Sequence, residues 1–165
     1  MPLFKPTYNV NSILEIPVEF FKNHKINSVL IDIDDTLTSH GEQSINSDTL
    51  HWIELLRSNG INLILVSNNF KKRVSIFAKS VGLPYVHMSL KPLPWGFSRA
   101  LKRLSSTKEK SVIIGDQLFT DILGANLVGI RSVLVEPRSK SKTLMLKIKR
   151  YIENPIRKKF QKNKL

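Results

Sequence analysis

Cysteine is absent from this chain of 165 residues. Its absence excludes disulfides, thiolate metal ligands and a cysteine nucleophile, and it fits a reducing cytoplasm. No apolar run approaches the roughly 18 residues that a membrane-spanning helix needs. No basic segment leads into an apolar stretch near the first residue, so a secretory signal is not expected. With 41% hydrophobic and 24% charged residues, the composition instead favours one globular domain in the cytoplasm.

Two common catalytic patterns are also missing. The chain has no Gly-x-x-x-x-Gly-Lys-Ser/Thr sequence, which disfavours a P-loop nucleotide triphosphatase. Its few histidines are scattered, with no spacing typical of a metal site or a Ser-His-Asp triad. They are His24, His40, His51 and His87. Histidine chemistry is therefore not expected to carry the function.

Negative charge is scarce in the last fifth of the chain. The whole sequence has 26 basic and 13 acidic residues, a net charge of +13. Residues 131–165 hold 12 basic and 2 acidic side chains, or +10, and residues 1–130 hold the remaining +3. Such a basic end favours an anionic partner, which could be nucleic acid, an anionic membrane surface or an acidic protein. The simpler alternative is a solvated tail that only aids solubility.

Strand-like and helix-like segments alternate along the chain. Five short segments rich in Val, Ile and Leu predict strands. They are residues 28–33, 61–66, 84–88, 111–114 and 131–135. Apolar residues at helical spacing predict helices in the intervals between them. We therefore expect an α/β protein, a Rossmann-like three-layer α/β/α sandwich with a mainly parallel five-stranded sheet, whose strand carboxyl ends share one edge.

The two ends of the chain are expected to behave differently. The apolar residues of segment 1–27 predict an N-terminal arm packed on the body, so the domain is expected to span residues 1–153. Residues 140–153 have the pattern of a last helix, which Pro155 should break. Residues 154–165 would then form a basic tail, loose from residue 156 onward.

The sharpest motif is a set of three carboxylates, Asp32, Asp34 and Asp35, where the first buried strand ends. Burying unpaired carboxylates is costly, so a counter-ion is expected. A hard divalent cation with oxygen ligands, with Mg²⁺ as the first choice, would supply it. The plainer alternative is an acidic turn in which Asp35 caps the following segment.

The next strands end in complementary polar groups. Ser67 and Asn68 follow the second strand and offer a hydroxyl and N–H groups for phosphate, although either could simply cap a helix. Lys91 follows the third strand. It could neutralise the charge of a phosphate, and the alternative is an ordinary surface lysine. Asp116 and Asp121 follow the fourth strand. These groups are expected to converge at one edge, where ligands of such sheets bind.

In this order the residues resemble a known family. Asp32-x-Asp34-x-Thr36, Ser67, Lys91 and Gly115-Asp116, with Asp121 behind them, resemble the four motifs of haloacid dehalogenase (HAD) superfamily phosphatases. The sequence around these motifs resembles that of the YqeG-like branch of subclass IIIA, which is related to mitochondrial phosphatidylglycerophosphate phosphatases. The resemblance covers roughly residues 8–155. One departure is Asp35, where relatives often have Asn.

The resemblance implies a role for each matching residue. Asp32 would attack phosphorus and form an aspartyl-phosphate, and Asp34 would act as general acid and then general base. Ser67, Asn68 and Lys91 would bind the phosphoryl oxygens. Mg²⁺ would be held by Asp32, Asp116 and the backbone carbonyl of Asp34, with Asp121 orienting the metal shell or Lys91.

The short spacing between motifs leaves no room for a separate cap domain. Thirty-four residues separate Asp32 from Ser67, and 23 separate Ser67 from Lys91. We expect an open site with a flap at residues 37–44, which suits a phosphate on a large or lipid-borne substrate, phosphatidylglycerophosphate being the candidate. The basic C-terminal helix would then lie on the inner face of an anionic membrane. In the alternative, the apolar stripe of this helix packs on the sheet.

Two further functions remain open at this stage. One is an RNA- or ribosome-associated binding protein with a vestigial site, which the basic tail would serve through phosphate contacts. The other is a phosphatase of broad specificity for small phosphomonoesters.

Overall fold

A parallel sheet runs through the middle of the protein. The computed structural model describes residues 3–139 and 144–160. The strands are β1 (Tyr8–Asn9), β2 (Ser28–Ile31), β3 (Asn62–Val66), β4 (Tyr85–Val86), β5 (Ser111–Gly115) and β6 (Arg131–Leu134). Their order in the sheet is β1-β6-β5-β2-β3-β4, and every pairing is parallel. The expected Rossmann-like α/β fold is confirmed.

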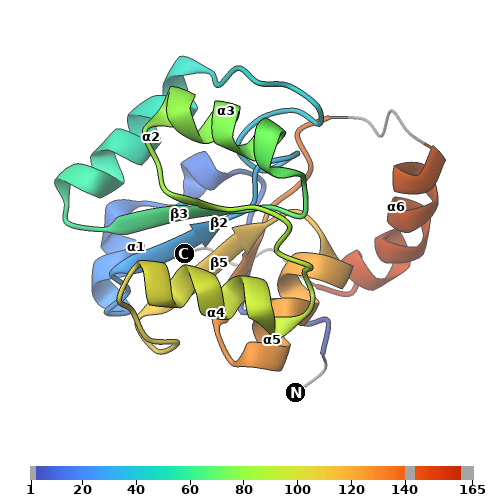
Figure 1. Ribbon diagram of the computed structural model, residues 1–165. Helices are drawn as coiled ribbons and strands as arrows, with labels where there is room; N and C mark the ends of the chain where they lie inside the picture. The colour runs from blue at the N-terminus through green and yellow to red at the C-terminus, as the bar shows by residue number, and fades with distance from the viewer. Residues whose placement is uncertain (1–2, 140–143, 161–165) are drawn as a thin grey trace.

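Helices cover both faces of the sheet (Figure 1). They are α1 (Val18–Asn23), α2 (Ser47–Ser58), α3 (Lys71–Val81), α4 (Pro94–Arg103), α5 (Leu123–Val128) and α6 (Leu144–Arg157), with short turns η1 (Ile13–Glu15) and η2 (Leu118–Ile122). Successive strand residues point to opposite faces. Val29 and Ile31 accordingly join the core under α1, α2 and α3, and Leu30 joins the core under α4 and α5.

The sheet has six strands rather than the five expected. The extra strand is β1, which comes from the N-terminal arm and pairs Tyr8 with Val133 and Asn9 with Leu134 of β6. A two-residue strand is too short to show an alternating pattern, so β1 could not be predicted from the pattern of residues. Three apolar residues of the same N-terminal segment, Ile13, Phe20 and Phe21, are buried in the core.

The C-terminal helix does not end where expected. Pro155 lies inside α6, so the predicted break at this residue is wrong. Proline removes one intrahelical hydrogen bond, and here the bond lost is to the carbonyl of Tyr151, on the exposed side of the helix. Ile156 and Phe160 pack against a small core cluster under η2, so residues 156–160 are not loose. Residues 161–165 lie outside the described residues.

No inserted domain interrupts the described residues between β2 and β4. The loop from Asp32 to Asn46 leads directly into α2, and its tip at residues 41–44 is exposed. No helix in the described segments is long and apolar enough to cross a membrane.

Candidate active site

Three buried carboxylates meet at the carboxyl edge of the two central strands. Asp32 follows β2, Asp116 follows β5, and Asp121 lies in η2. Each offers one oxygen, and these three oxygens lie within 4.8 Å of one another. Gly115 makes this approach possible, because a Cβ atom there would lie 2.4 Å from the carboxylate of Asp121. The predicted convergence of Asp32 with Asp116 and Asp121 is therefore present.

Lys91 is the buried counter-ion of this cluster. Its Nζ lies 2.6 Å from Oδ1 of Asp32 and 2.7 Å from Oδ1 of Asp121. It also donates a hydrogen bond of 2.8 Å to the backbone carbonyl of Val66 at the end of β3. The surface-lysine alternative is thus excluded, and one ammonium group connects three strand ends.

Burial and crowding shift the pKa values of these groups. Burial raises the pKa of Asp32 to about 7, against the opposing effect of Lys91. Burial also raises the pKa of Asp116 well above its usual value, and the charges of Asp32 and Asp121 add to this effect. For Lys91, burial alone would lower the pKa, but the charges of Asp121 and Asp32 outweigh it and raise the pKa. The cluster therefore has more negative charge than Lys91 neutralises.

The donor set fits a hard divalent cation. Oδ2 of Asp32 and both carboxylate oxygens of Asp116 are buried without a hydrogen-bond partner. Such oxygens are normally paired, or they coordinate a metal. Carboxylate oxygens in this number are the ligands that Mg²⁺ and similar cations prefer.

Asp34 lies two residues after Asp32, and its carboxylate bonds to residues outside the carboxylate cluster. Its Oδ1 accepts hydrogen bonds from the backbone N–H of Gly41, at 3.0 Å, and from Arg73. Its Oδ2 accepts one from Asn69 Nδ2 at 2.6 Å. His40 Nδ1 lies 3.7 Å from Oδ1. The side chain is thus held in one orientation beside the nucleophile candidate Asp32.

Ser67 and Asn68 follow β3 beside Lys91. Ser67 is buried, and its hydroxyl accepts a hydrogen bond of 3.2 Å from the backbone N–H of Asn69. The side chain of Asn68 bonds both the N–H and the carbonyl of Lys91, at 2.8 and 3.0 Å. Asn68 therefore shapes the Lys91 loop through its side chain.

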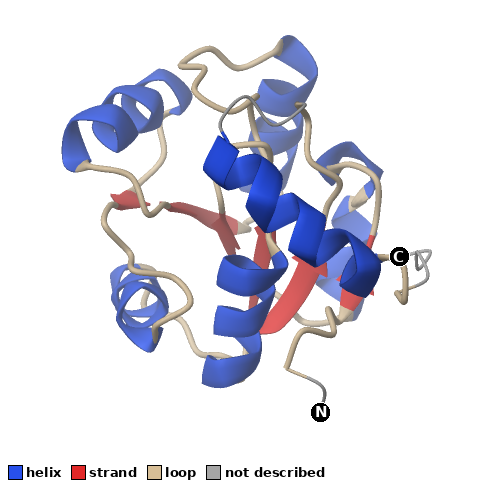
Figure 2. Ribbon diagram, turned by 90° about the vertical axis from the view of Figure 1, so that its right-hand side faces the viewer, coloured by secondary structure: helices blue, strands red, loops and turns tan. Residues whose placement is uncertain are grey.

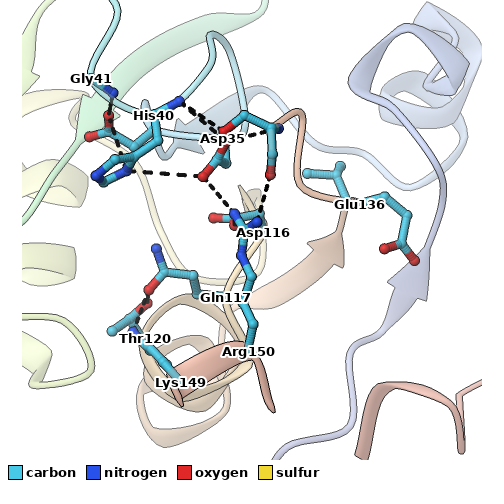
Figure 3. Close-up of polar contacts among 12 residues, drawn as sticks. Asp35, His40, Gly41, Asp116, Gln117, Thr120, Glu136, Lys149 and Arg150 are labelled. Atoms are coloured by element: carbon cyan, nitrogen blue, oxygen red, sulfur yellow. Dashed lines mark hydrogen bonds and ion pairs between the residues drawn. The ribbon is translucent and has the colours of Figure 1, made fainter. Parts of the chain in front are cut away.

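Asp35 has a structural task. Its backbone is left-handed, with φ of 61°, a conformation that Asp and Asn tolerate better than most residues. Its carboxylate bonds the backbone N–H of Ser139 at 3.0 Å and Nη2 of Arg150 at 2.6 Å. Figure 3 shows Arg150 reaching from α6 toward Asp35 and Asp116, with its Nη2 3.7 Å from Oδ2 of Asp116. Arg150 thus compensates the extra charge of Asp35.

Sequence reasoning missed three groups around the site: Arg73, His40 and Arg150. Arg73 lies in the first turn of α3, directly after the Ser67 loop, and this position was a usable signal. His40 lies five residues after Asp35, in the predicted flap. Arg150 is more than one hundred residues from Asp35, so no local pattern could reveal that pair.

The chain is similar to known phosphatases. A HAD-hydrolase-like family model matches residues 90–154. The probable phosphatase YqeG of Bacillus subtilis is 33% identical over 153 residues, which cover 93% of this chain and 89% of that protein. The mitochondrial phosphatidylglycerophosphatase GEP4 of Saccharomyces cerevisiae is 33% identical over 149 residues, covering 81% and 78%.

The fold is also found among solved structures. A crystal structure of an uncharacterized protein from Listeria monocytogenes serotype 4b has a TM-score of 0.58 at 18% identity, covering 72% of this chain and 86% of that one. Together with the carboxylate cluster, these findings define a HAD-type phosphatase. The chain belongs to the HAD-like hydrolases, in the branch that contains YqeG.

Proposed function

We propose that the protein is a Mg²⁺-dependent phosphomonoester phosphatase that works through an aspartyl-phosphate on Asp32. The observation that supports this most is the unpartnered, buried Oδ2 of Asp32 beside Lys91 and Asp116. The second oxygen of the same carboxylate is already bound to Lys91. One oxygen is therefore held and the other is available for attack on phosphorus.

In the first half-reaction, Oδ2 of Asp32 forms a bond to phosphorus as the bond to the leaving oxygen breaks. Asp34, in its protonated form, gives its proton to that leaving oxygen. Lys91, the Ser67 hydroxyl and the backbone N–H of Asn68 bind the phosphoryl oxygens, where fixed charges and dipoles stabilise the transition state.

In the second half-reaction, the Asp34 carboxylate removes a proton from water, and the water oxygen attacks phosphorus. The bond between phosphorus and Asp32 breaks, which releases inorganic phosphate and restores both carboxyl groups. Asn69 and Arg73 act as positioning residues, because their contacts hold the Asp34 carboxylate in one orientation beside Asp32.

Asp32 and Asp116, with the backbone carbonyl of Asp34, would hold Mg²⁺, and Asp121 would orient this shell through Lys91. The bound cation would neutralise negative charge on the phosphoryl group.

For the substrate, we propose a lipid-borne phosphate, with phosphatidylglycerophosphate as the candidate. The support is the similarity to GEP4, whose name states this activity, and the absence of an inserted cap in the described residues. The protein would then work in the cytoplasm at the inner face of an anionic membrane.

The structure gives less support to the RNA-binding alternative. Arg150 and Arg157, two basic residues in the described part of the C-terminal segment, bond to Asp35 and to the backbone of Asp116. They are therefore not available to contact RNA phosphates.

The test is phosphate release from phosphatidylglycerophosphate in mixed micelles and from a soluble aryl phosphate, with Mg²⁺ and with a chelator. We expect Asp32→Asn to abolish turnover of both substrates, and wild type to prefer the lipid. Exposed Asp48→Asn on α2 is the matched control and should retain full activity. Turnover of both substrates by Asp32→Asn would exclude the aspartyl-phosphate. Equal or better turnover of small phosphates would favour the broad-specificity phosphatase.

A further inference from the structure

Helix α6 presents its apolar side to solvent. Leu144, Ile148, Tyr151 and Ile152 are all exposed, and they recur at the three- and four-residue spacing that places them on one side of the helix. We call these four residues the α6 ridge. A surface helix of a globular protein normally turns such a stripe toward the core. The alternative in which this stripe packs on the sheet is therefore wrong for these four side chains.

The charged side of α6 faces the protein. Lys149 bonds to Gln117, and Arg150 pairs with Asp35. Buried Glu153 accepts a hydrogen bond of 3.1 Å from the backbone N–H of Phe119. These contacts, several of which appear in Figure 3, fix the helix with its ridge outward.

Arg157 secures the last turn of the same helix. It donates to the backbone carbonyls of Asp116 and Val135 at 2.6 and 2.9 Å. Its partners, like those of Arg150, belong to the carboxyl edge of the sheet. The α6 ridge is therefore held beside the catalytic residues, and Figure 2, which looks toward this edge, shows α6 in front of the sheet.

Other exposed apolar side chains lie on the opposite flank of the same edge. They follow β3 and β4, the strands on the far side of β2 from β5 and β6. They are Phe70, Met88, Leu90, Leu93 and Trp95. Apolar side chains thus lie on both sides of the buried carboxylates along the sheet. Exposed apolar side chains gathered at one edge of a protein are typical of an interaction site.

Resting on the proposed function, we infer that the α6 ridge inserts into an anionic bilayer, with Phe70 and Trp95 contacting the same surface from the other flank. The carboxyl edge would then face the headgroups, where a lipid phosphate reaches Asp32 without leaving the membrane. Binding is through the apolar side of the helix, because its basic side is occupied by the protein's own carboxylates and carbonyls.

Charge complementarity favours an anionic bilayer over a second copy of the chain. The net charge of +13 repels another copy and attracts anionic lipid. Lys147 is exposed beside the ridge, as are Lys158 and Lys159 just beyond the helix. An apolar ridge with lysines at its border is the arrangement of interfacial helices, in which lysines contact headgroups and apolar side chains enter the acyl boundary.

The test compares two double variants, each of which replaces two apolar residues by uncharged glutamine. Binding is measured by flotation with vesicles of phosphatidylglycerol and phosphatidylcholine. Ile148→Gln with Ile152→Gln removes the centre of the ridge, where the side chains are 54% and 52% exposed. The control is Leu55→Gln with Leu127→Gln, 42% and 54% exposed, in the last turns of α2 and α5 at the opposite edge. Circular dichroism and thermal melting check that both fold.

We expect the ridge variant to lose about tenfold or more in vesicle affinity, and the control to bind like wild type. The ridge variant should still hydrolyse a soluble aryl phosphate at the wild-type rate. Absence of wild-type binding, or equal binding by both variants, would overturn the inference. A wild-type dimer that the ridge variant converts to monomer would also overturn it, in favour of a second copy on the ridge.

The second measurement is quenching of tryptophan fluorescence by brominated lipid. The chain has two tryptophans, and Trp52 is buried while Trp95 is exposed. Quenching of Trp95 is expected, and its absence would remove the far flank from the inferred surface. Vesicle binding without turnover of any phosphate would contradict the proposed function and leave the docking surface standing. Aryl phosphate turnover without vesicle binding would contradict the docking surface and leave the proposed function standing.

Discussion

Replacing Lys91 by methionine tests the electrostatic argument for the site most directly. Methionine keeps a similar length and apolar stem but removes the ammonium group. The variant leaves Asp32 and Asp121 without the cation that lies 2.6 and 2.7 Å from their oxygens. It also leaves the Val66 carbonyl without its donor. Since all of these groups are buried, losing the cation costs more than it would at the surface.

The expected cost follows from the burial of this ion pair. Removing one partner of a buried pair typically costs about 3–5 kcal/mol, because an uncompensated charge remains. For a domain of this size each kcal/mol lowers the melting temperature by about 2–4 °C, so the metal-free variant should melt about 6–20 °C below wild type. The loss should be smaller at pH 6 than at pH 8, because the pKa of Asp32 is already about 7 and protonation removes its charge.

The assay is thermal and urea unfolding of the metal-free protein in a chelator at both pH values. Lys102→Met on α4 is the matched control, because Lys102 is exposed and its loss should cost little. Added Mg²⁺ should stabilise Lys91→Met more than wild type, since the carboxylates then lack their own cation. A Lys91→Met variant that melts together with Lys102→Met in the chelator would refute the assignment of Lys91 as the counter-ion.

Two further predictions concern packing and pH. Gly115→Ala should lower stability by about 1–3 kcal/mol and greatly reduce kcat, because the new Cβ would lie 2.4 Å from Asp121; wild-type kcat would contradict this. Burial raises the pKa of Glu153, so the folded state holds its proton more tightly than the unfolded state. The penalty for ionising Glu153 therefore appears as pH rises above about 4.5, its ordinary pKa. Glu153→Gln should melt higher than wild type at pH 8 and equally at pH 4, and a lower melting point at pH 8 would show that the charged carboxylate is stabilising.

Local sequence patterns were enough to predict the central strands and the edge of the sheet where the candidate catalytic and phosphate-binding residues lie. The run of Val, Leu and Ile before Asp32 predicts a strand because it is short, rich in β-branched residues and followed directly by Asp residues. Parallel strands then put Asp32 and Asp116 at the same edge of the sheet, and the pairing of β2 with β5, which only the structure shows, brings the two residues together. For the same reason Lys91 was expected near the carboxylates, although its spacing alone did not distinguish it from a surface lysine.

The sequence by itself determined which side chains share a face of α6, because helical spacing depends only on position along the chain. It did not determine which face turns inward. That choice depends on Asp35 and the backbone of Asp116, which lie far from Arg150 and Arg157 in the sequence. Ionic contacts at the buried edge hold the basic side inward and leave the apolar ridge outside, contrary to the usual preference for apolar burial. Only the tertiary structure brings these charges together, and so only it could decide the orientation of the helix.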